Sequence, residues 1–97
     1  MQKIITINED VRDQIQALQY EVDSRKDLLT FMVDKGCDVS SDSFKAYHKE
    51  YQEFHIQYEA AKEEMQKQIL EPAVPGKLIR WDLNFATCQA VCVYEEK

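Results

Sequence analysis

Two long runs of apolar residues in heptad spacing, joined by a short segment that contains a glycine, constrain this chain more than any other feature. The steps between apolar residues are almost all three or four, which keeps the residues on one face of an α-helix. The sequence therefore predicts two amphipathic helices. The first run comprises Val11, Ile15, Leu18, Val22, Leu29 and Met32. The second comprises Phe44, Tyr47, Tyr51, Phe54, Tyr58, Ala61, Met65 and Ile69.

Residues that favour helix ends mark the limits of both predicted helices. Asn8 precedes Glu9 and Asp10 and is expected to cap the first helix, which we place at residues 8–36 with Gly36 at its end. Ser40 is the expected cap of the second helix, residues 40–71, and Pro72 is expected to end it. The short connection favours an antiparallel hairpin.

The hairpin brings the two apolar runs together. Pairing them from the turn outward places Leu18 opposite Tyr58, and Val22 opposite Phe54. Arg25 interrupts the apolar seam opposite Tyr51. Its guanidinium is expected to lie on that ring or to reach a carboxylate, Glu50, on the second helix.

The C-terminal part changes to a period of two. After a Pro-bounded linker at residues 72–76, the apolar residues Ile79, Trp81 and Leu83 alternate with polar ones, and residues 77–95 predict a β-hairpin. Residues 3–7 predict a short strand. The expected fold is a single, mainly α domain over residues 1–97: a long, coiled-coil-like antiparallel two-helix hairpin with a small antiparallel β element.

Composition and charge limit the partners. Eighteen acidic against twelve basic residues give a net charge of -6, which argues against nucleic-acid binding. No apolar run is long enough for a membrane span or a signal peptide. We therefore expect a cytoplasmic, reducing location, where Cys37, Cys88 and Cys92 are free thiols.

Several apolar residues are left over once the seam is formed, and they are the candidate contact residues. Tyr20, Leu28 and Phe31 lie off the seam of the first helix, and Tyr51 is the least certain of the seam aromatics. Trp81 is expected either to cover the open end of the hairpin or to contact a partner. Partners are therefore expected to be copies of this chain, another protein, or both.

No residue pattern predicts an enzyme. A Gly-rich phosphate loop and a nucleophile motif are missing from the sequence. His48 and His55 are seven residues apart and lack the Glu-x-x-His spacing of di-iron bundles. We expect no cofactor, no metal and no catalytic residue.

The sequence favours a non-enzymatic assembly or adaptor protein that acts through its helical hairpin and a β-edge. Two alternatives remain open. In one, the chain is a substrate whose C-terminal tail is modified by an enzyme at Cys88 and Cys92. In the other, His48, His55 and Glu59 form a metal or redox site when helices of several copies combine.

Overall fold

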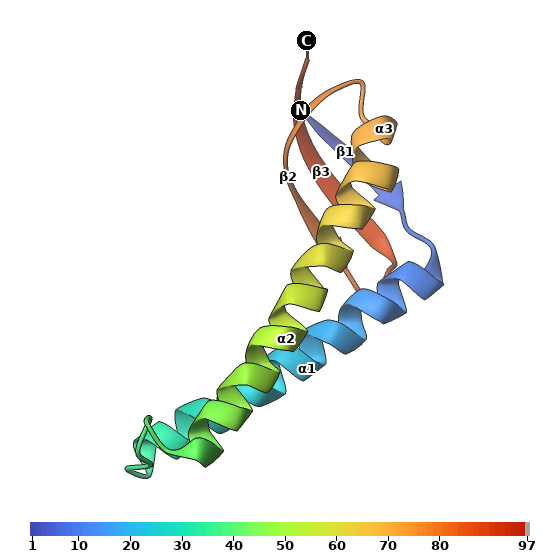
Figure 1. The fold of residues 1–97 in the computed structure, drawn as a ribbon. Coiled ribbons are helices and arrows are strands. Elements are labelled where there is room, and N and C mark those ends of the chain that lie inside the picture. The colour runs from blue at the N-terminus through green and yellow to red at the C-terminus, as the bar shows by residue number, and fades with distance from the viewer. Residues whose placement is uncertain (97) are drawn as a thin grey trace. The chain divides into compact units, whose positions relative to one another are not determined.

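The computed structural model describes residues 1–96 and confirms a mainly α fold with a small antiparallel sheet (Figure 1). Two long helices are followed by a π-helical turn, a short helix and two strands, while the third strand comes from the N-terminus. The elements in chain order are β1 (Gln2–Thr6), α1 (Glu9–Asp34), α2 (Asp42–Met65), η1 (Gln66–Leu70), α3 (Glu71–Ala73), β2 (Gly76–Asn84) and β3 (Gln89–Glu96).

The chain forms two compact units. One consists of Met1–Gln16 and the residues from Ala61 onward, and the other of Ala17–Ala60. The first unit contains the sheet and nearly all of the buried apolar side chains. These are Ile7, Ile15, Met65, Leu70, Val74, Cys88, Ala90 and Cys92.

Local hydrogen bonds set both ends of α1. The Asn8 carboxamide oxygen accepts a bond from the Asp10 N–H at 2.7 Å, which confirms the predicted N-cap. At the other end Gly36 has φ +80, and the Cys37 N–H reaches the Met32 carbonyl at 2.9 Å. This six-residue closure is the Schellman motif, which requires a left-handed residue and therefore favours glycine.

The cap of α2 lies one residue later than predicted. The Ser41 hydroxyl, rather than that of Ser40, accepts the Phe44 N–H at 3.2 Å. Ser40 instead donates from its N–H and hydroxyl to the Asp38 carboxylate, at 2.8 and 2.7 Å, which lowers the pKa of Asp38. The Asp38 side chain thus competes for Ser40 and moves the start of the helix.

Helical structure also passes Pro72, where it was expected to stop. Over Gln66–Leu70 the chain is π-helical, and the Glu71 N–H bonds to the Gln66 carbonyl. This wider turn places Pro72 in the first turn of α3. A proline is favoured in the first turn of a helix because its fixed φ matches helical geometry.

The sheet has the order β1–β3–β2, all antiparallel, so the last strand of the chain is the central one. Ile5 and Leu83 both pair with Ala90, which is fully buried. The turn between β2 and β3 lacks an Asn-Gly pair. The Asn84 carboxamide oxygen closes it by accepting the N–H groups of Ala86 at 2.9 Å and Thr87 at 3.2 Å.

The inward face of β2 differs from the predicted alternation. A β-bulge shifts the register between Leu78 and Arg80. Leu78 becomes half-buried, whereas Ile79, predicted to lie on the apolar face, is 53% exposed. The extra residue of the bulge reverses the alternation locally, and Trp81 and Leu83 keep their predicted side.

In the second unit, residues 17–34 and 42–60 lie side by side and antiparallel (Figure 1). Arg25 joins them. Its Nε donates to the Glu50 carboxylate at 2.8 Å, as expected, and it also pairs with Glu21 on its own helix. The guanidinium lies over Phe54, one helical turn from the expected ring of Tyr51.

Candidate interaction surfaces

The outer face of α1 carries the most exposed of the predicted contact residues. Tyr20 is 70%, Phe31 57% and Leu28 39% exposed. The opposite face of the same half-helix holds Val22, which is 6% exposed, and the half-buried Leu29. Tyr20, Leu28 and Phe31 are therefore available for a contact, and their role as contact residues stays a prediction.

The exposure of the aromatic side chains of α2 differs from the expectation. Tyr47, taken as part of the seam, is 44% exposed, whereas Tyr51 is half-buried. The rings of Phe44 and His48 stack with centroids 6.2 Å apart, and His48, Tyr51 and His55 continue the row at 6.4 and 5.9 Å. The row follows one helix face at steps of four and three, so Tyr51 packs between two imidazoles.

The two histidines are therefore members of an aromatic row. His55 Nε2 lies 3.9 Å from a carboxylate oxygen of Glu59, at the limit of an ion pair. Among residues 1–96 no three His, Cys, Asp or Glu side chains are grouped closely enough to hold a metal ion. The metal-site alternative requires helices of several copies and stays a prediction.

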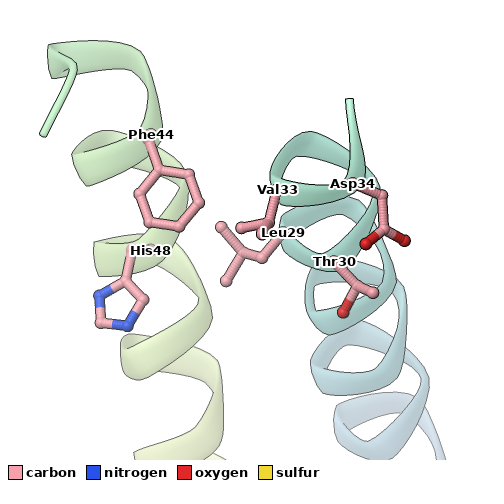
Figure 2. A pocket seen from close by; sticks show the side chains of 6 residues that line it. All are labelled: Leu29, Thr30, Val33, Asp34, Phe44 and His48. Carbon is pink, nitrogen blue, oxygen red and sulfur yellow. The ribbon is translucent and has the colours of Figure 1, made fainter. Parts of the chain in front are cut away.

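A groove of about 300 Å³ lies near the hairpin turn in the second unit. Figure 2 shows Leu29 pointing across the gap toward Phe44, with Val33 beside it. The groove is open to solvent, whereas small-molecule sites bury most of their ligand. It is a shallow apolar depression between two helices, lined by Leu29, Thr30, Val33, Asp34, Phe44 and His48.

Trp81 connects β2 to the π-helical turn. Its indole N–H donates to the Gln66 carboxamide oxygen at 3.1 Å, and the Gln66 amide donates to Glu71 at 3.3 Å. The side chain of Trp81 is half-buried. Much of its surface is thus engaged within the first unit, which favours the covering role over a contact with a partner.

Cys88 and Cys92 are small buried residues of the sheet region. Cys88 is 8% exposed at φ +58, and its carbonyl accepts the Ile7 N–H at 2.7 Å. Cys92 is fully buried in the central strand, and burial raises the pKa of its thiol. An enzyme acting on the Cys92 thiol would first have to open the sheet, and Cys88 is buried in the turn before β3, which weighs against the modified-tail alternative.

The sequence predicted a β-edge as a contact surface without indicating which strand provides it, and the outer edge of β2 is one such edge. Sheet order leaves this edge without a neighbouring strand. Arg80 and Asp82 are both exposed on the same side of the strand, and neither has an ion-pair partner within the described chain. The sequence signal for this pair is two opposite charges, two residues apart, in a segment where apolar and polar residues alternate.

None of the helices within residues 1–96 is long and apolar enough to cross a membrane. Among known proteins, no family model matches the chain, and no curated protein or solved structure is significantly similar to it.

Proposed function

We propose that this chain is a non-enzymatic assembly protein that acts by docking, first onto copies of itself through the free edge of β2. The observation that carries the proposal is the unpaired couple of Arg80 and Asp82 on that edge. An unpaired edge strand is a ready template for another strand. Three free thiols fit a reducing compartment such as the cytoplasm.

The charges on the edge are self-complementary. When two copies of β2 pair antiparallel about a two-fold axis at Trp81, Arg80 of each copy lies opposite Asp82 of the other. Opposite charges facing each other across strands contribute about 0.2–1 kcal/mol per pair. The two symmetric pairs therefore select this register, while main-chain hydrogen bonds and apolar contacts supply most of the affinity.

The bulge limits how much of the strand takes part. Residues 80–84 follow the bulge and keep a regular register with β3. Bulges are one way in which natural sheets prevent their edge strands from pairing with other chains. Here the bulge lies before Arg80, so it leaves the complementary charges and the residues beyond them on the regular part of the strand.

Light scattering on the full chain, from micromolar to near-millimolar concentration, tests the proposal. We expect a dimer, with twice the 11.4 kDa mass of the chain. Arg80→Asp and Asp82→Arg each place like charges opposite each other and should give monomers. The double exchange restores opposite pairs and should restore the dimer.

A matched control reverses a charge away from the edge, at the exposed Glu53 of α2. Glu53→Lys should leave the dimer unchanged, and circular dichroism of every variant checks that the helices remain. A monomer at all concentrations for the natural chain, or a dimer that ignores the single reversals at Arg80 and Asp82, would overturn the proposal.

A further inference from the structure

A stripe of two aromatic and three acidic residues runs along the outer face of α1 within the second unit. Its members are spaced by three, four, four and three residues, which places them on one narrow face of the helix. All five are exposed. We refer to them as the acidic stripe: Tyr20, Asp23, Asp27, Phe31 and Asp34.

The stripe carries negative charge that no ion pair compensates. Asp23, Asp27 and Asp34 have no ion-pair partner within residues 1–96. The exposed cations of this half of the helix and its end are Lys26 and Lys35. The Lys35 ammonium lies 5.6 Å from the centroid of the Phe31 ring, so this ring already accepts a cation on its face.

We propose that the acidic stripe binds an amphipathic helical segment of another protein that presents arginines on one face. A guanidinium can pair with a carboxylate and stack on an aromatic ring at the same time, which a lysine ammonium does less well. Tyr20 and Phe31 are eleven residues apart, about 16 Å along the helix axis. A partner of a few helical turns therefore spans both rings and the carboxylates between them.

A symmetric contact between two copies through this face is unfavourable. Stripe against stripe would bring three aspartates of one copy beside three of the other, and like charges in contact repel. Nucleic acid is repelled for the same reason. The inference rests on the proposed docking role and gives the helical surface a partner different from that of the β2 edge.

The direct test is a fluorescence-anisotropy titration of a labelled, arginine-faced amphipathic peptide with the full chain. The peptide has about 18 residues, or about 27 Å of helix. The comparison peptide has the same composition with its arginines scattered around the helix. We expect saturable binding of the first peptide, weakened by salt, and much weaker binding of the second.

Variants of the stripe identify the site. Three exposed ion pairs together change an affinity by about tenfold, so Asp23→Asn, Asp27→Asn and Asp34→Asn combined should weaken binding by about that factor. Tyr20→Ser with Phe31→Ser should also weaken it. The matched control removes three exposed carboxylates elsewhere, as Glu53→Gln, Glu64→Gln and Glu95→Gln, and should change the affinity by less than about twofold.

The outcomes separate this inference from the β2 dimer. Absence of saturable binding, equal binding of the scattered peptide, or an equal loss in the control variant would overturn it, because only the overall charge would then attract the peptide. Repeating the peptide titration on the Arg80→Asp variant separates peptide binding from dimer formation. We expect that variant to bind the peptide as a monomer, and the triple asparagine variant to keep the dimer mass.

Discussion

Arg25 on α1 lies over the ring of Phe54 on α2, with the guanidinium carbon 4.1 Å from the ring centroid. The same side chain pairs with Glu50 on α2 and with Glu21 on α1. A charged residue at a seam position fixes the register of packed helices at some cost in stability. Arg25 therefore fixes how the two helices of the second unit align.

Replacing Arg25 tests this role. We expect Arg25→Ala to lower Tm more than Glu50→Gln, because alanine loses the ring contact as well as both ion pairs. Arg25→Met keeps an apolar contact with Phe54 and should recover most of the loss. Calorimetric Tm values check the order. Equal Tm values for Arg25→Ala and the natural chain would show that this contact contributes nothing.

Leu70 is the residue whose truncation should cost most. It lies in the π-helical turn and is fully buried. Leu70→Ala leaves a cavity, and we expect a loss of about 2–5 kcal/mol in the free energy of unfolding. Leu28→Ala is the matched control on an exposed face and should cost less than about 1 kcal/mol. Urea denaturation of both variants measures the difference, and similar losses would contradict the assigned core.

The two glycines are required for different reasons. Gly36 has φ +80 and open space around it, so Gly36→Ala meets only a conformational cost of about 1–2 kcal/mol. A Cβ at Gly76 would overlap the Glu95 carbonyl, so Gly76→Ala must push β2 away from β3. We expect Gly76→Ala to destabilise the chain more than Gly36→Ala in thermal unfolding. The reverse order would contradict the strand pairing.

The first heptad pattern predicted most of what is local in this fold. Steps of three and four, the Asn8 cap and the glycine at position 36 were sufficient to place α1, because each acts within a few residues. The β element followed from the alternation around Trp81. A small sheet joining the N-terminal strand to the C-terminal strands followed from topology, whereas the order of its strands, β1–β3–β2, was not predicted.

Features that depend on competition between neighbours were not predictable. Ser41 caps α2 because Asp38 engages Ser40, and the bulge exposes Ile79 because one extra residue reverses the alternation. The π-helical turn lets the helix pass Pro72, although proline normally ends helices. Among the candidate surfaces, Tyr20 and Phe31 were visible as residues off the seam, whereas the β2 edge emerged only with the strand order.

Stability should depend on the Cys92 thiol at alkaline pH. Burial raises its pKa in the folded chain, so the unfolded chain loses this proton first as pH rises past the ordinary thiol value of about 8.5. The contribution of the neutral thiol is fully present below that pH and is lost above it. We expect the Tm of the natural chain to fall further between neutral and alkaline pH than the Tm of the Cys92→Ala variant does.

Thiol labelling provides the control for that experiment. Cys37 lies in the turn between the helices and is half-buried, so it should react first. Cys92 should react only when the sheet unfolds. Rapid labelling of Cys92 in the native chain, or equal pH dependence in the Cys92→Ala variant, would show that the thiol is not held in a dry site.

Amide hydrogen exchange along β2, measured at low and high protein concentration, tests the proposed self-association most directly. If the free edge pairs with a second copy, amides of residues 80–84 that point away from β3 become protected as the concentration rises. The Arg80→Asp variant should show no such change. Exchange along β2 that is independent of concentration would contradict the proposal.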